Sequence, residues 1–166
     1  PDLNLWTQSL HFGAEGRMHF IHKKTNFKVG GGLDDVWLNT KTNKIHIVDF
    51  KSTSQKKNNG PITLNDYWKN TYKRQMDLYV WIMRNKGFAI ENVGFFLYCD
   101  GDRFTKNKFL NNKIGNMEFK MTLIPYQTDT TWIDSTLSKI KDNLLLSRRP
   151  IHNVRCEFGI FLKNAL

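Results

Sequence analysis

The sequence predicts one mixed α/β domain in which a central sheet of about five strands is flanked by helices. Short apolar and aromatic segments occur in the order three strands, a helix, two strands and a second helix. The length of 166 residues and the hydrophobic content of 40% suit a single hydrophobic core. No internal repeat or linker divides the chain, so we treat residues 1–166 as one domain.

Three extended segments come first. Residues 17–22 and 27–38 are predicted strands separated by the polar turn 23–26. A polar connection, 40–44, leads into a third predicted strand, 45–53. Consecutive strands with short connections usually pair as neighbours, so we expect these three to form an antiparallel meander.

Two helices alternate with two further strands. A helical pattern runs from about residue 65 to residue 85 and is stopped by Gly87. The predicted strands 93–99 and 119–125 follow, joined by a long polar loop, and a second helix spans 132–147. We expect apolar packing to hold this helix and the C-terminal tail, through Leu144, Phe158 and Phe161.

Charge and cysteine content restrict the class of protein. A formal net charge of +10 favours a polyanionic partner, most commonly nucleic acid. Cys99 and Cys156 cannot form a disulfide framework, and without a CxxC pair we expect a reducing, cytoplasmic location. No apolar stretch approaches the length of a membrane span, so we expect no membrane partner.

The segment Asp49-Phe50-Lys51 follows the apolar run 45–48 of the third strand and carries most of the functional information. Side chains two apart on a strand project to the same face, which puts the Asp49 carboxylate beside the Lys51 ammonium. Pairing of the second and third strands can place Asp34 beside Asp49, and two carboxylates with the Phe50 carbonyl suffice for Mg²⁺ or Mn²⁺. Asp35 is an alternative ligand to Asp34, and an Asp–Lys pair on a strand is also compatible with a solvated ion pair.

Gln75 and Tyr79 lie one helical turn apart and therefore share a face of the predicted helix. Beside a metal site, Gln75 can bind a DNA phosphate or a water molecule. Tyr79 is equally compatible with a core aromatic whose hydroxyl is satisfied.

Several basic and aromatic residues are candidates for nucleic-acid binding. Tyr67 and Trp68 can stack on bases. Scattered basic residues are also ordinary surface, so each is weighed as a candidate phosphate contact only. These basic candidates are Lys56, Lys57, Lys73, Arg74 and Arg103.

The segments around Asp34, around Asp49-Phe50-Lys51 and from Gln75 to Tyr79 together resemble the PD-(D/E)XK nuclease superfamily. The resemblance is in particular to its RecB-like branch, which includes the nuclease domains of RecB and AddB and the CRISPR-associated adaptation exonucleases. The resemblance implies a restriction-endonuclease-like core and Mg²⁺-dependent hydrolysis of DNA phosphodiester bonds, by exonuclease or endonuclease action. It implies metal ligation by Asp34 and Asp49, a catalytic role for Lys51, and a helix pair, Gln75 and Tyr79, facing the site. The matching segments are Gly31-Gly32-Leu33-Asp34-Asp35-Val36, Val48-Asp49-Phe50-Lys51-Ser52-Thr53 and Gln75-Met76-Asp77-Leu78-Tyr79.

The chain departs from that family in two places. RecB-like nucleases often carry a His or Glu on a helix upstream of the first Asp; His11 and Glu15 lie close to the predicted first strand, so we expect that helix to precede Pro1. Gly159 stands where a second cysteine would follow Cys156, so we expect no iron–sulfur cluster. The main alternative function is a nucleic-acid-binding module on the same scaffold that does not cleave, within a larger DNA-processing complex.

Overall fold

The structure, a computed structural model, describes residues 18–55, 60–103, 110–111, 114–148 and 153–165. It is mixed α/β, as the sequence predicts. In chain order the elements are β1 (Met18–His22), β2 (Phe27–Gly31), β3 (Asp35–Asn39), β4 (Lys44–Thr53), the 3₁₀ turn η3 (Tyr67–Lys69), α1 (Asn70–Asn85), β5 (Val93–Gly101), β6 (Leu110–Asn111), β7 (Ile114–Gly115), β8 (Phe119–Gln127), α2 (Ile133–Leu144) and α3 (Glu157–Ala165).

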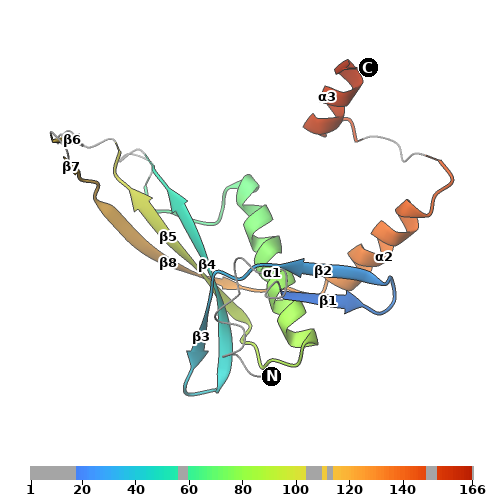
Figure 1. Ribbon diagram of the computed structural model, residues 1–166, viewed down its shortest axis with the longest axis horizontal. Coiled ribbons are helices and arrows are strands. Elements are labelled where there is room, and N and C mark those ends of the chain that lie inside the picture. Colours follow the sequence, from blue (N-terminus) through green and yellow to red (C-terminus); the bar gives the residue numbers. More distant parts are fainter. Residues whose placement is uncertain (1–17, 56–59, 104–109, 112–113, 149–152, 166) are drawn as a thin grey trace.

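Four strands form the main sheet, in the order β3-β4-β5-β8 (Figure 1). β4 and β5 are parallel, whereas the β3–β4 and β5–β8 pairs are antiparallel. A parallel pair cannot be joined by a tight turn and needs a crossover, which α1 provides. The sheet is therefore mixed, with its parallel pair at the centre.

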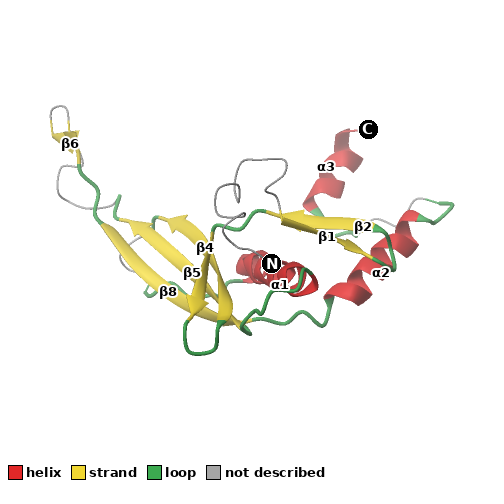
Figure 2. Cartoon of the chain, turned by 60° about the horizontal axis from the view of Figure 1, so that its bottom comes forward, coloured by secondary structure: helices red, strands yellow, loops and turns green. Residues whose placement is uncertain are grey.

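Helix α1 lies between this sheet and the β1–β2 hairpin, which it contacts on its other side (Figures 1 and 2). Its apolar stripe is fully buried at Met76, Val80 and Met83. The helix approaches β5 so closely that a Cβ atom on Gly94 would lie 2.5 Å from the sulfur of Met76. Most of the hydrophobic core is thus built around one helix.

The predicted meander is wrong, because the segment 27–38 is two strands. β2 pairs only with β1 in a separate two-stranded sheet, and β3 starts at Asp35 and pairs with β4. Between them Leu33 is completely buried in the core. Burial of this side chain takes the chain from the hairpin layer into the main sheet, which consequently has four strands.

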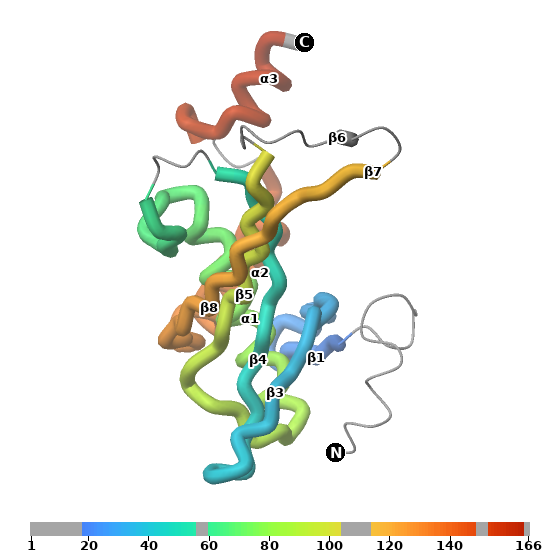
Figure 3. The backbone as a smooth tube through the Cα atoms, turned by 90° about the vertical axis from the view of Figure 1, so that its left-hand side faces the viewer, coloured from blue at the N-terminus to red at the C-terminus, as the bar shows by residue number. Residues whose placement is uncertain are grey.

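The helices also differ in detail from the prediction. The first begins with the 3₁₀ turn η3 before α1, and the second, α2, ends at Leu144. The tail forms α3, which stands apart from the main sheet (Figures 1 and 3). Phe158 is 82% exposed, and Leu144 and Phe161 are also exposed, so the expected apolar packing of the tail is wrong. The spacing predicted the first two helices but not α3, and it could not tell which apolar side chains find a partner.

Two further features bear on where in the cell the protein is expected: its cysteines and its helices. Cys99, in β5, and Cys156, before α3, are both free thiols. Within the described part of the chain, no helix is long and apolar enough to cross a membrane.

A buried carboxylate, Asp77, attaches the C-terminal part of the fold to α1. It accepts hydrogen bonds from the Asp129 backbone N–H (2.9 Å), the Trp132 indole N–H (3.1 Å) and the Tyr126 hydroxyl (3.3 Å). Burial raises the pKa of the Asp77 carboxyl, and the hydrogen bonds oppose that rise. β8 and the start of α2 are thereby held against α1 by one side chain.

We predict that Asp77→Ala destabilises the protein by about 3 kcal/mol, because it leaves buried donors unpaired and removes a whole network. Urea unfolding followed by circular dichroism measures this free energy. Tyr126→Phe removes only one of the three bonds and should cost about 1 kcal/mol. Equal losses in the two variants would contradict the network.

Candidate metal and nucleic-acid site

The start of β3 brings Asp34, the residue before the strand, to the middle of β4. Asp35 pairs with Val48 in the antiparallel register, so the preceding residue comes level with Asp49. The Phe50 backbone N–H donates a 2.7 Å hydrogen bond to Oδ2 of Asp34. This bond confirms the predicted proximity of the two strands at the proposed site.

Asp49 and Lys51 share the face of β4 that is covered by α1. Their carboxylate and ammonium groups are in direct contact as an ion pair, although Asp49 is only 2% exposed. The solvated ion pair considered from the sequence is therefore excluded. Burial raises the pKa of the Asp49 carboxyl, Lys51 counteracts that rise, and the charge of Asp34 adds to it.

One oxygen of Asp49 lacks a hydrogen bond. Its Oδ2 atom lies against the Lys51 ammonium, yet no hydrogen bond of ordinary geometry reaches it from the described residues. The ion pair with Lys51 is therefore what compensates this buried oxygen, and a divalent cation bound there would have to compete with the ammonium.

The Phe50 carbonyl lies at the same edge of β4. In an extended strand the N–H and C=O of one residue point to the same side, as residue pairs that exchange both hydrogen bonds require. The Phe50 N–H is hydrogen-bonded to Asp34, which precedes the first residue of β3. The Phe50 C=O is therefore directed to the same edge of β4, toward β3. Two carboxylates and one carbonyl thus border one region, a donor set that fits Mg²⁺ or Mn²⁺.

Gln75 and Tyr79 of α1 face this region, as the shared helix face predicts. The Gln75 side-chain oxygen lies 3.4 Å from the Lys51 ammonium, and its NH₂ group donates to the Tyr79 hydroxyl at 2.7 Å. Tyr79 is buried, and burial raises the pKa of its hydroxyl, as do the charges of Asp49 and Asp34. Tyr79 is therefore both a core aromatic and a neighbour of the site.

Gly31 makes room for this tyrosine. A Cβ atom at position 31 would lie 2.6 Å from the Tyr79 ring. Because the contact is with a large side chain held in the core, an alanine here would push the ring away from Gln75. Gly31 consequently serves the close approach of β2 to α1.

Two tyrosines at the site were not singled out from the sequence. The Lys51 ammonium lies 4.6 Å from the centre of the Tyr72 ring, a cation–π contact. Tyr98 pairs with Lys51 across the parallel β4–β5 ladder, and burial raises the pKa of its hydroxyl to about 12. Like Asp49 Oδ2, the buried Tyr98 hydroxyl has no hydrogen-bond partner among the described residues. Helical spacing predicts that Tyr72 shares a face with Gln75 and Tyr79, although it assigns Tyr72 no role in the site, whereas Tyr98 requires knowledge of the strand pairing.

Asp35, the alternative ligand, has other partners. Its two oxygens accept hydrogen bonds from the Val36 backbone N–H at 2.8 Å and the Trp37 indole at 2.9 Å. These bonds fix the start of β3. Geometry therefore favours Asp34 over Asp35 as the second carboxylate.

The basic candidates are distributed unevenly. Arg74 lines a shallow pocket with Gly31, Gln75 and Tyr79, beside the site. Lys73 is two residues before Gln75, about 200° around the helix, and is half-buried on another face. Lys56 and Lys57 lie outside the described residues.

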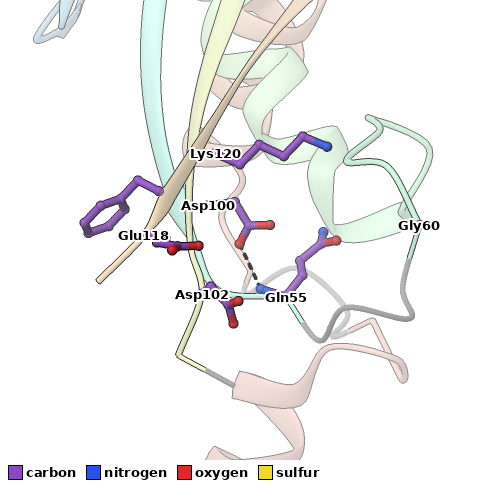
Figure 4. Close-up of a pocket in the computed structure, with 7 residues that line it drawn as sticks. Gln55, Gly60, Asp100, Asp102, Glu118 and Lys120 are labelled. Atoms are coloured by element: carbon purple, nitrogen blue, oxygen red, sulfur yellow. Dashed lines mark hydrogen bonds between the residues drawn. The ribbon is translucent and has the colours of Figure 1, made fainter. Parts of the chain in front are cut away.

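Arg103 lies at the far end of β5. Asp49 pairs with Phe96, and β5 continues five residues further to Gly101, which is about 17 Å along the strand. Another pocket occurs at this end (Figure 4), lined mainly by the polar and acidic residues Gln55, Asp100, Asp102, Glu118 and Lys120. Its three carboxylates disfavour a polyanion. The prediction that Arg103 shares a nucleic-acid surface with Arg74 is therefore not supported by the fold, which places the two residues far apart.

Comparison of the chain with protein-family models, with curated proteins and with solved structures finds no match. Within the described residues no group of three or more His, Cys, Asp or Glu side chains is placed to hold a metal ion. A site at Asp34 and Asp49 would thus have two carboxylates, the number that Mg²⁺ commonly uses together with water and substrate oxygens.

We predict that Mn²⁺ raises the melting temperature, because a ligand that binds only the folded state stabilises it by mass action. At 100 times its Kd the gain is about 2.7 kcal/mol. Differential scanning fluorimetry with and without EDTA measures the shift, and Asp49→Asn should remove most of it. Asp102→Asn, in the acidic pocket, is the matched control and should leave the shift intact; the reverse pattern would place the metal in that pocket.

Proposed function

We propose that this protein is a metal-dependent nuclease that hydrolyses phosphodiester bonds of DNA, on a PD-(D/E)XK scaffold of the RecB-like type. The observation that carries the proposal is the convergence of Asp34, Asp49, the Phe50 carbonyl and Lys51 at one edge of β4. The burial of the Asp49 carboxylate and the nearby charge of Asp34 support a cation there. A buried carboxylate kept only for stability would be costly.

Each residue has a role that follows from its position. Asp34, Asp49 and the Phe50 carbonyl would hold Mg²⁺ or Mn²⁺, and the bound ion would activate water and stabilise charge on the phosphate oxygens. Lys51 would hold a non-bridging oxygen of the scissile phosphate and balance the charge that develops on it. Gln75 fixes the Lys51 ammonium and the Tyr79 hydroxyl, which keeps the polar side of α1 in register with the strand.

The reaction is a hydrolysis. Water attacks phosphorus, one phosphorus–oxygen ester bond breaks, and a phosphomonoester and a free hydroxyl are formed. The net charge of +10 and the position of Arg74 beside the site suit a polyanionic substrate. We place the protein in the reducing cytoplasm, to which its two free thiols are suited.

We predict that Asp34→Ala and Asp49→Ala abolish cleavage of a labelled DNA in Mg²⁺ and that Lys51→Ala strongly reduces it. Loss of the lysine alone should lower kcat by about 10²–10³, the effect of removing one preorganised charge-stabilising group. Because the residues act as a unit, double variants should be no worse than the single ones.

Asp35→Asn is the matched control, since it changes a neighbouring carboxylate that is bonded to Trp37 instead of the site. It should keep its activity. Full activity in Lys51→Ala would contradict the proposed nuclease. DNA binding without cleavage in the unaltered protein, with any metal, would leave the non-cleaving binding module as the function.

We also predict that Arg74→Ala makes DNA binding less dependent on salt. Loss of one phosphate contact should lower the slope of log K against log salt by about one, without changing sequence preference. Fluorescence anisotropy in EDTA at several salt concentrations measures this slope. Lys139→Ala removes the same charge from the exposed surface of α2 and should leave the slope unchanged.

A further inference from the structure

We propose that Trp68 is a base-stacking platform that holds an unpaired base next to the scissile phosphate and gives the site a preference for unpaired DNA. This inference rests on the proposed function. The juxtaposition that supports it is a stripe of residues at helical spacing, which leads from an exposed aromatic ring to the catalytic lysine. In chain order the stripe consists of Trp68, Tyr72, Gln75 and Tyr79.

The spacing of these residues puts them on one side of η3 and α1. Successive members are four, three and four residues apart, the intervals that keep side chains on one helix face. Gln75 and Tyr79 form the part that faces Asp49, whereas Trp68 is at the open end, in the 3₁₀ turn. A strand that follows this face would thus pass the ring before it reaches the site.

Trp68 is exposed but fixed in orientation. The residue is 57% exposed, yet its ring packs edge-on against Tyr72, with ring centres 5.5 Å apart and planes at 84°. The buried Lys69 ammonium lies 5.1 Å from the same ring and is itself fixed by Asp66 and the Thr63 carbonyl. A large aromatic surface that is open to solvent and already ordered loses little entropy on stacking.

The ring is also close to the proposed chemistry. Tyr72 contacts Trp68 on one side and the Lys51 ammonium on the other, at 5.5 Å and 4.6 Å from its ring centre. The separation of Trp68 from Lys51 is therefore at most these two distances taken together. This span is short, so the stacked base would belong to a nucleotide close to the scissile phosphate.

Stacking on this ring requires an unpaired base. Inside a duplex both faces of each base are covered by its neighbours, and extrusion costs unstacking and unpairing energy. In a single strand every base has a free face, and aromatic side chains bind such faces with little sequence preference. Trp68 should therefore contribute to binding of single strands and hardly at all to binding of an internal duplex.

The test is a binding measurement in EDTA, which separates stacking from catalysis. A fluorescein-labelled single-stranded 12-mer and a hairpin duplex whose loop is a non-nucleotide linker, so that it has no unpaired base, are titrated with the unaltered protein, Trp68→Ala and Trp68→Phe. We expect Trp68→Ala to weaken single-strand binding about tenfold, Trp68→Phe to retain most of the affinity, and hairpin binding to stay unchanged. Phe119→Ala, which removes a similarly exposed ring (59%) from β8, is the matched control and should have no effect.

A second arm uses the substrate instead of the protein. A 12-mer in which every position is abasic should remove the difference between the unaltered protein and Trp68→Ala, because it offers no base to the ring in any register. Equal affinities of these two proteins for the intact 12-mer, or equal losses on 12-mer and hairpin, would overturn the inference while leaving the nuclease proposal open to its own cleavage test. A stacking effect without cleavage would sink the nuclease proposal and keep the platform, and no DNA binding at low salt would overturn both.

Discussion

The burial of the Asp49 carboxylate is the constraint on which the site depends. At 2% exposure this group lies where a strand normally carries an apolar side chain, and desolvation raises its pKa. A buried charge has to be compensated by neighbours. Lys51 supplies the opposite charge, and Gln75 and Tyr72 in turn hold Lys51. The polar residues of α1 therefore contact the lysine that compensates the buried Asp49 carboxylate. Without that lysine, burial of the charge would be strongly unfavourable.

The same helix serves both the core and the site. One side of α1 buries Met76 and Met83, and the side that begins at Gln75 faces β4 with polar groups. Because α1 is also the crossover between the parallel strands β4 and β5, its position relative to Asp49 is fixed by the sheet itself. Asp77 adds a second attachment, to β8 and α2. Rigid elements of this kind keep catalytic groups in place better than loops do.

Local patterns predicted much of this arrangement, and long-range pairing limited the rest. The two-residue period placed Asp49 beside Lys51, and the helical period placed Gln75 beside Tyr79, because both rules depend only on neighbouring residues. The break between β2 and β3 was not predicted, since it depends on the burial of Leu33. The exposure of Phe158 was missed for the same kind of reason. An apolar pattern shows which side chains gain from burial, but not whether a partner surface lies within reach.

Lys51 has a position that links the two halves of the proposed chemistry. Its ammonium contacts the Oδ2 atom of Asp49, one of the two oxygens of a carboxylate that is proposed to hold the divalent cation. Two cations cannot share one oxygen at close range without strong repulsion. Occupancy of the metal site would therefore displace the ammonium toward its other neighbours, the Gln75 oxygen and the Tyr72 ring. Both of these lie on the stripe that leads to Trp68, so the displaced charge would move toward the path proposed for the DNA strand. The Lys51 ammonium, which is paired with Asp49 here, would then become available to bind the scissile phosphate.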